Sequence, residues 1–209
     1  MEYAPSATST DSRREQDHLK IFPDTIGNFA LGVGSVKKQH VVVDIHTGDN
    51  GISPKLNGTG AKVIAIDQGK ALGLKLNGGP AEGRGMEFDN DASGLMLPMG
   101  PRSVDIVFVD LVLHHMQTPA QAIMEIKRIL KPGGRLVITD IQKYSDGEFQ
   151  TALRGKWMGF YPGDLRHWMK SAGFSNIIVN PVPTRYISPR SAVERRMTSI
   201  GFLIATGTA

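Results

Sequence analysis

The sequence predicts an α/β fold built on a buried, parallel sheet. Apolar runs rich in β-branched residues occur at 41–45, 61–67, 104–110 and 135–140, and such runs are typical of strands covered on both faces. Turn-forming or helical segments separate them, as in β-α-β units. Acidic residues lie at the ends of these runs, and open α/β sheets bind ligands beyond the carboxyl ends of their strands. The pattern therefore indicates where a ligand site would lie.

Length and composition are those of one globular domain. The chain has 209 residues, of which 40% are hydrophobic and 21% charged. No apolar run approaches the roughly 20 residues needed to cross a bilayer. The first residues have neither the basic start nor the apolar block of a secretory signal. We expect residues 1–22 to be a flexible tail and residues 23–209 to be a single domain in a cytoplasmic protein, with homo-oligomerisation left open.

The basic charge is dispersed, and this argues against a nucleic-acid partner. The net charge is +4, but the arginines are interspersed with acids or spread along the chain, and no stripe of alternating basic and aromatic residues occurs. We interpret the excess as a solvated surface. The absence of cysteine excludes disulfides, thiolate metal sites and cysteine nucleophiles.

The first half of the chain is organised around the run 41–45 and the turn that follows it. Pro23 is expected to break any helix before it, and residues 26–31 either cover a pocket mouth or close the core. A short or irregular helix is expected after the first run, because its segment holds several residues of low helix propensity: Gly51, Pro54, Asn57, Gly58 and Gly60.

The second run ends in Asp67, about 20 residues after the first. This spacing fits a β-α-β unit in which the second acid reaches a ribose, although Asp67 could instead cap the segment 68–76. A short third strand is expected at residues 86–88, followed by the acidic stretch 89–92.

The third and fourth long runs enclose the clearest helix. Thr118 and Pro119 predict its start, with threonine as cap and proline at the first helical position. Its apolar face recurs at helical spacing, and Lys131–Gly134 is expected to end it with a left-handed glycine cap. The last part of the chain predicts a helix over 164–172 and strands over 176–182 and 200–206. The Pro- and Arg-rich connection between those strands is either a flexible loop or part of an interface.

Two segments give the chain a strong family resemblance. Residues 105–116 and 125–140, the latter reading EIKRILKPGGRLVITD, resemble class I S-adenosylmethionine-dependent methyltransferases nearly residue for residue. The resemblance covers roughly residues 40–207 and is to the small-molecule type that includes ubiquinone/menaquinone C-methyltransferases and arsenite methyltransferases. It implies a Rossmann-like, doubly wound, mostly parallel seven-stranded sheet with an antiparallel last strand.

The resemblance also implies S-adenosylmethionine as cofactor and a small-molecule methyl acceptor. Asp44, Thr47 and Gly48 would lie beneath the methionine end of the cofactor, with His46 beside them. Asp67, with Gln68 next to it, would accept hydrogen bonds from the ribose. The remaining predicted cofactor contacts are Asp91 and Ala92 at the adenine and Asp110 between cofactor and substrate. His114 and His115 are the candidate catalytic residues.

The glycine loop departs from the family pattern. His46 stands in place of its first glycine and Asn50 in place of its third, which adds side chains where backbone and cofactor approach closely. Gly51 could take over part of this role in a shifted turn. One alternative is therefore a degenerate methyltransferase fold that serves as a non-catalytic binding or regulatory subunit.

Several chemical alternatives stay open. A base is needed only if the acceptor must lose a proton, and the candidates are His46, His114, His115 and Asp110. The same histidines with Asp44 and Asp110 could form a metal site, although their spacing is not diagnostic, and we predict no metal. A nicotinamide-dependent oxidoreductase would have the same β-α-β unit with an acid at the end of its second strand. Trp157, Phe160 and Tyr161 either line an apolar substrate pocket or pack against the final helix.

Overall fold

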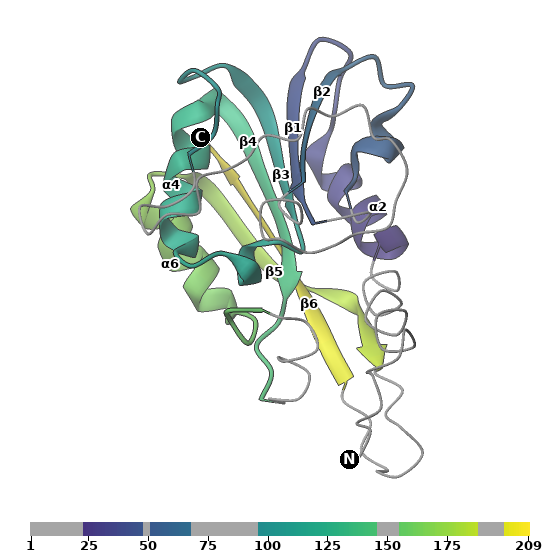
Figure 1. Ribbon diagram of the computed structural model, residues 1–209, viewed down its shortest axis with the longest axis vertical. Coiled ribbons are helices and arrows are strands. Elements are labelled where there is room, and N and C mark those ends of the chain that lie inside the picture. Colours follow the sequence, from purple (N-terminus) through teal and green to yellow (C-terminus); the bar gives the residue numbers. More distant parts are fainter. Residues whose placement is uncertain (1–22, 48–50, 68–95, 146–154, 188–198) are drawn as a thin grey trace, which may run out of the picture.

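The structure is a computed structural model, and it describes residues 23–47, 51–67, 96–145, 155–187 and 199–209. Its centre is one six-stranded sheet of order β2-β1-β3-β4-β6-β5 (Figure 1). The strands are β1 (Val41–His46), β2 (Lys62–Asp67), β3 (Val104–Asp110), β4 (Leu130–Ile141), β5 (Ser175–Ile187) and β6 (Ser199–Thr208). The four strands β2, β1, β3 and β4 pair in parallel, and β6 is antiparallel to both of its neighbours.

This topology confirms the mostly parallel sheet and the antiparallel last strand. The resemblance implies seven strands, whereas the described part of the chain contains six. The short strand predicted at 86–88 lies outside the described residues. In the described sheet β2 is an edge strand, so the described residues leave one side of it without a partner strand.

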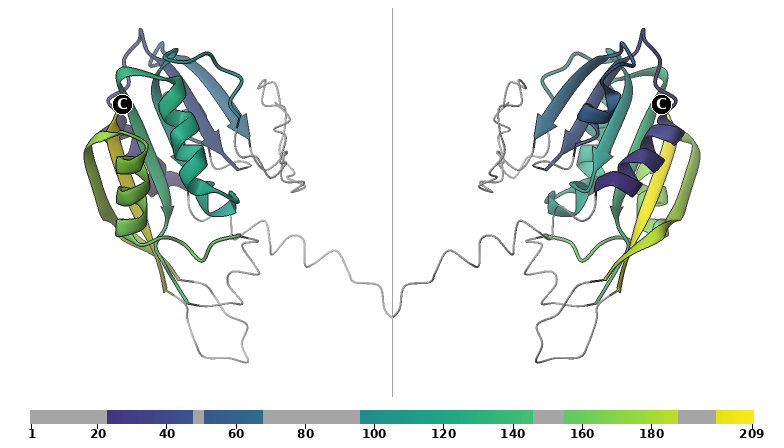
Figure 2. Two further views of the ribbon diagram at one scale, coloured as in Figure 1. Left: turned by 90° about the vertical axis from the view of Figure 1, so that its left-hand side faces the viewer. Right: turned by 90° about the vertical axis from the view of Figure 1, so that its right-hand side faces the viewer.

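Helices cover both faces of the sheet, as Figure 2 shows. Helices α4 (Pro119–Ile129) and α6 (Pro162–Ser171) lie on one face, and α2 (Pro23–Gly34) lies on the other together with the 3-10 turn η2 (Ser53–Leu56). Successive strand residues alternate between the two cores: Val107 belongs to the α4/α6 core, while Ile106 and Phe108 belong to the α2 core. The strands are apolar on both sides because both faces are buried.

The segment after β1 is short and irregular, as its composition predicts. Only the four-residue 3-10 turn η2 connects the described residues of this crossover. Residues 26–31 belong to α2, and Ala30 is buried in the same core as Phe108, so α2 closes the core. A Cβ on Gly34 would collide with the Phe108 ring, which shows how closely α2 ends against β3.

Helix α4 begins where the sequence predicts but ends differently. Pro119 is its first residue and Thr118 is at the N-cap position, but the Thr118 side chain makes no capping hydrogen bond. The helix ends at Ile129, and Leu130 is already extended and begins β4, so the predicted glycine cap is wrong. Gly133 does adopt a left-handed conformation, with φ of 79°, but it lies inside β4 and donates its N–H to the Ala209 carbonyl.

The last three elements are confirmed with longer strands. Helix α6 starts two residues before the predicted helix, with Leu165 and Met169 fully buried. Strand β5 continues to Ile187, so part of the predicted loop or interface is regular sheet, and residues 188–198 lie outside the described residues. Across the described ranges, no helix has the length and apolar character of a membrane span.

Candidate functional site

The buried polar side chains gather at one end of the sheet. Eight polar or charged side chains are buried within the described residues, and all eight lie at or just after the carboxyl ends of β1, β3 and β4: Asp44, His46, Thr47, Asp110, His114, His115, Thr139 and Asp140. Buried polar groups cost free energy unless they are paired or serve a ligand. This concentration marks the carboxyl edge as the candidate site, at the edge where the sequence predicts it.

The strand register aligns part of this cluster. His46 of β1 is opposite Asp67 of β2 and Asp110 of β3, and Asp110 is opposite Thr139 of β4. Four neighbouring parallel strands therefore carry a row of polar residues at the same height, at or near their carboxyl ends. For Asp67 the structure describes the backbone position only.

Asp44 anchors the turn after β1. Its Oδ2 atom accepts hydrogen bonds from the backbone N–H of Ser53 at 2.7 Å and from Ser53 Oγ at 2.5 Å. His46 Nδ1 lies 3.4 Å from the same oxygen. A Cβ at Gly51 would come within 2.8 Å of Asp44 Oδ2 and 2.7 Å of His46 Nδ1. Gly51 therefore lies tightly against these two side chains, and any larger residue at this position would collide with them.

Asp110 is a carboxyl group in an unfavourable place for charge. Burial raises its pKa to about 7, and the nearby carboxylates Asp44 and Asp140 act in the same direction. A hydrogen bond from Thr139 Oγ1 and the neighbouring His46 oppose this shift. Near neutral pH, Asp110 is thus populated both as acid and as carboxylate, so it can donate or accept a proton.

His114 is held by Asp140 from the next strand. The 3-10 turn η3 (Leu113–His115) follows β3, and it places His114 Nδ1 2.8 Å from Asp140 Oδ1. The backbone N–H of His114 also donates to Asp140 Oδ2 at 3.3 Å. Both side chains are buried, and the His115 ring lies 4.0 Å from the His114 ring. With the Asp140 carboxylate as acceptor, this contact places a proton on His114 Nδ1.

Three buried polar atoms of this cluster have no hydrogen-bond partner among the described residues. They are Asp44 Oδ1, Thr47 Oγ1 and His114 Nε2. Such orphaned atoms are uncommon in folded proteins, and each calls for an explanation such as a ligand or a catalytic role. They include a carboxylate acceptor and a hydroxyl at the end of β1, which suits a ligand carrying hydrogen-bond donors.

Not every predicted site residue can be placed. Gly48, Gln68, Asp91 and Ala92 lie outside the described residues. The other predicted residues, Asp44, His46, Thr47, Asp110, His114 and His115, share the cluster at the carboxyl edge. Sequence reasoning assigned no role to Asp140, Thr139 or Ser53. The signal for the first two was available, because strands 104–110 and 135–140 end in polar residues and parallel neighbours bring such ends together.

The aromatic residues near the cluster pack mainly on α6. Phe160 is fully buried, and its ring meets Trp168 of α6 edge-on at 5.5 Å. Trp157 meets Trp168 at 5.9 Å, and its indole N–H donates to the Met116 carbonyl. This supports the packing interpretation, while Trp157 stays partly and Tyr161 largely exposed. The described residues contain no group of three acidic or histidine side chains arranged as metal ligands.

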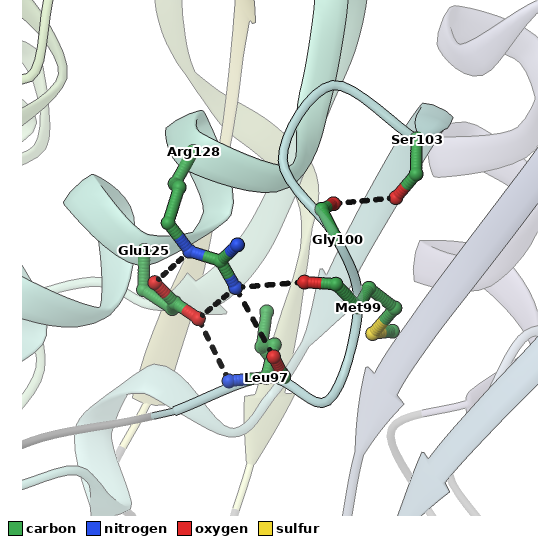
Figure 3. Close-up of polar contacts among 6 residues, drawn as sticks. All are labelled: Leu97, Met99, Gly100, Ser103, Glu125 and Arg128. Atoms are coloured by element: carbon green, nitrogen blue, oxygen red, sulfur yellow. Dashed lines mark hydrogen bonds and ion pairs between the residues drawn. The ribbon is translucent and has the colours of Figure 1, made fainter.

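A second polar cluster holds the segment before β3 rather than the site (Figure 3). The Arg128 guanidinium donates to both Glu125 carboxylate oxygens at 2.7 Å and to the carbonyls of Leu97 and Met99. Glu125 Oε1 also accepts from the Leu97 N–H. These bonds lower the pKa of Glu125, although burial opposes them. The helix α4 pair thereby fixes the chain entering β3.

Comparison with known proteins shows similarity to methyltransferases over part of the chain. A family model described as a methyltransferase domain matches residues 43–138, from β1 to β4. The chain is 32% identical over 120 residues to a demethylmenaquinone methyltransferase of Renibacterium salmoninarum, covering 57% of this chain and 48% of that protein. It is 35% identical over 82 residues to a tRNA U34 carboxymethyltransferase of Hydrogenovibrio crunogenus, covering 35% of this chain and 24% of that protein. The chain thus spans half or less of these relatives.

Solved structures share the fold over most of the chain. One is the complex between the Haloferax volcanii Trm112 methyltransferase activator and a putative methyltransferase, which matches with a TM-score of 0.69. The match covers 95% of this chain and 93% of the solved chain at 20% sequence identity, and at this identity it shows a shared fold only.

Proposed function

We propose that the chain is a class I S-adenosylmethionine-dependent methyltransferase that transfers a methyl group from S-adenosylmethionine to a small molecule. The methyltransferase-domain match over residues 43–138 and the fold shared with a solved methyltransferase support this proposal. The observation that carries the proposal is the buried polar cluster at the carboxyl edge, with Asp44 Oδ1 and Thr47 Oγ1 lacking partners among the described residues. These atoms suit the ammonium and other donors of the methionine part of the cofactor.

The residues of the polar row would hold the cofactor across the strand ends. Asp44, His46, Thr47 and Gly48 would face its methionine end, and Asp67 with Gln68 its ribose. Asp91 and Ala92 would meet the adenine, and Asp110 would lie between cofactor and acceptor. When bound, the sulfonium supplies an already activated methyl group, so the protein contributes chiefly alignment and charge.

The three aspartates suit a cationic ligand. Asp44, Asp110 and Asp140 are buried close enough for their charges to interact, and no lysine or arginine is buried with them in the described cluster. Such a site favours a positive sulfonium over the neutral thioether that remains after transfer. His114 and His115 lie in η3, which follows β3, and would face the acceptor.

The alternative is a non-catalytic subunit with the same fold. Loss of ligand binding would remove the reason to keep unpartnered polar atoms buried, and sequence drift would replace them with apolar groups. The intact cluster therefore favours the enzyme. The tRNA-directed name of one relative is a property of that protein, and the dispersed charge of this chain favours a small acceptor.

Calorimetric titration tests the proposal directly. The purified protein is titrated with S-adenosylmethionine and, separately, with S-adenosylhomocysteine. We expect micromolar binding of both at a stoichiometry of one, with Asp67→Ala weakening both by removing the ribose acceptor. A folded protein that binds neither would contradict the proposal and favour the non-catalytic subunit.

The substituted glycine loop gives a sharper test. If His46 merely fills space left by the lost glycine, His46→Gly should keep or improve cofactor affinity. A loss of tenfold or more in the folded variant would instead identify His46 as a cofactor contact. Circular dichroism of the variant provides the folding control.

A further inference from the structure

A cavity of about 290 Å³ lies at the amino end of the sheet, away from the candidate site. Its walls come from the end of α2, the connection to β1 and the first residues of β3 and β4. Asp105 on its wall and Asp110 at the candidate site are both on β3, and their separation is about 16 Å along an extended strand. A small ligand in this cavity would therefore not touch the residues of the candidate site.

The charged side chains that line this cavity are mostly cationic. The described lining residues include three cations, which are Lys37, Lys131 and Arg135. Asp105 is the only acid among these described residues, so the wall carries an excess of two positive charges. Its carboxylate is already committed, because it accepts from Lys131 Nζ at 2.8 and 2.9 Å and from the Val41 N–H. A recess lined by one sign of charge concentrates anions from solution.

Several hydrogen-bond donors on this wall have no partner among the described residues. Lys37 Nζ makes no hydrogen bond or ion pair there. Arg135 uses Nη1 for the carbonyls of Val33 and Gly34, at 2.8 and 3.2 Å, which leaves Nε and Nη2 for another acceptor. His40 Nδ1 accepts from the Lys37 N–H at 3.1 Å, so a neutral His40 ring carries its proton on Nε2. The cavity thus suits a ligand rich in acceptor atoms.

Most of this wall is held in place without a ligand. Arg135 is anchored on the last carbonyls of α2, and Lys131 is anchored on Asp105. Gly134 packs closely, since a Cβ there would lie 2.8 Å from the Lys131 carbonyl oxygen and 3.1 Å from that of Asp105. Only Lys37 is exposed and without such an anchor. A ligand would therefore have to order little more than one side chain, which keeps the entropic cost of binding low.

Charge and size together select the chemical class of the ligand. A phosphate monoester carries about −1.5 to −2 charges at neutral pH and three terminal oxygens, which match the excess of two charges and the free donors. A guanidinium binds such oxygens through a planar fork of N–H groups. A carboxylate would neutralise only half of the excess. Ligand pockets typically measure about 300–1,000 Å³, so a cavity at the lower limit suits a small ester better than a nucleotide.

We propose that the cavity at the amino end of the sheet is a second binding site, which takes the phosphate group of a small phosphate monoester through Lys37, Lys131 and Arg135. The site is distinct from the proposed methyl transfer and does not depend on it, because it shares no residue with the polar row at the carboxyl edge. Lys37 would close on the phosphate from the rim, Arg135 would offer Nε and Nη2, and Lys131 would add its charge while still bonded to Asp105.

The first experiment compares two simple phosphate esters by calorimetry at pH 8. Methyl phosphate is a dianion at this pH, and dimethyl phosphate is a monoanion of similar size. We expect saturable binding of methyl phosphate at a stoichiometry of one, with dimethyl phosphate at least about tenfold weaker. The affinity should be the same in the presence of S-adenosylhomocysteine, because the two sites are separate. A folded protein that does not bind methyl phosphate, or that binds both esters equally, would overturn the proposal.

A matched pair of charge reversals tests the role of the cavity. Lys37→Glu places a negative charge on the rim, so methyl phosphate should bind at least about tenfold more weakly. Lys38→Glu changes the net charge equally at the adjacent exposed position, which does not line the cavity, and should cost less than about threefold. Thermal unfolding of both variants provides the folding control. Equal losses in the two variants would mean that the anion senses only the overall charge, and would contradict a defined site.

The last experiment locates the anion and tests a polyanion in its place. In ¹H–¹⁵N spectra, methyl phosphate should shift the backbone signals of Lys37, Gly133 and Gly134 and leave those of Thr47 and Asp110 unchanged. The reverse pattern would put the anion at the carboxyl edge and overturn the proposal. A short RNA with a 5′-hydroxyl end should not displace methyl phosphate. An RNA that displaces it and binds more tightly would assign this end of the sheet to a nucleic-acid backbone instead.

Discussion

Asp105 and Asp110 stand near opposite ends of strand β3 and differ in almost every respect. At the amino end, Asp105 accepts two hydrogen bonds from Lys131 Nζ, at 2.8 and 2.9 Å, and one from the Val41 N–H. These contacts lower its pKa, although burial acts against them. At the carboxyl end, Asp110 receives one bond from Thr139, and burial among other carboxylates raises its pKa to about 7.

The difference extends to the two ends of the sheet. The amino end opens on a cavity of about 290 Å³ lined by Lys37, Lys131 and Arg135, whose charges and donors are in part already used by Asp105 and by the carbonyls of residues 33 and 34. The carboxyl end buries acids and histidines and leaves some of their atoms unpartnered among the described residues. Asp105 at the amino end is thus fully paired, whereas several buried polar atoms at the carboxyl end have no partner among the described residues.

The largest expected effect concerns the pH dependence of stability through Asp110. Its folded pKa of about 7 lies above the unfolded value of 3.8, so the folded state binds the extra proton and stability falls as the pH rises between these values. The full loss is on the order of 4 kcal/mol. The Asp110→Asn side chain cannot ionise. The free energy of unfolding of this variant should therefore increase relative to that of the wild type as the pH rises from 4 to 8. Urea unfolding at several pH values measures this, and parallel curves would remove the contrast between the two aspartates.

The next effect concerns the cofactor and Asp44. Asp44→Asn removes a buried negative charge while keeping the shape, so S-adenosylhomocysteine should bind about 10- to 100-fold more weakly, the equivalent of one charged hydrogen bond. Ser53→Ala is the matched control, because it removes one hydrogen bond to Oδ2 and leaves Oδ1 unchanged. Equal affinity losses in both variants, measured by calorimetry, would mean that Asp44 acts only through the turn.

The smallest effect belongs to Asp105. Asp105→Asn weakens the bonds from Lys131, whose side chain is 42% exposed, so only about 1 kcal/mol of stability should be lost. Because the folded pKa of Asp105 is lowered, this loss should be present above the unfolded value near 3.8 and should fade as the pH falls below it. Cofactor affinity should stay unchanged, and a tenfold change in calorimetry would show that the amino end also serves the site.

Much of this fold follows from local sequence. The apolar runs at β1, β2, β3 and β4 were recognisable because strands buried on both faces must be apolar throughout. The end of α4 could not be recognised in the same way, because Lys131–Gly134 has the composition of a segment that ends a helix. The backbone is already extended at Leu130, where pairing with Val104 begins β4. Tertiary pairing decided a boundary that local propensity placed later.

The site was only partly predictable for a similar reason. The sequence pattern makes some site residues recognisable as polar residues at or after the ends of apolar runs: Asp44, Asp110 and the histidines. The bond between His114 and Asp140 joins residues 26 positions apart, and it depends on η3 bringing the ring back over the end of β4. The orphaned atoms cannot be inferred from residue types, since they result from which neighbours a fold supplies.

The aligned register of the four parallel strands sets a regular spacing between the polar residues near their carboxyl ends. Residues 67, 46, 110 and 139 stand side by side across four strands, and neighbouring strands are about 4.8 Å apart, so the row measures about 14 Å from end to end. A ligand laid along it meets one strand end at each interval. Substituting one of these residues therefore changes the contact that one strand would make with such a ligand, and leaves the contacts at the other three strands in place.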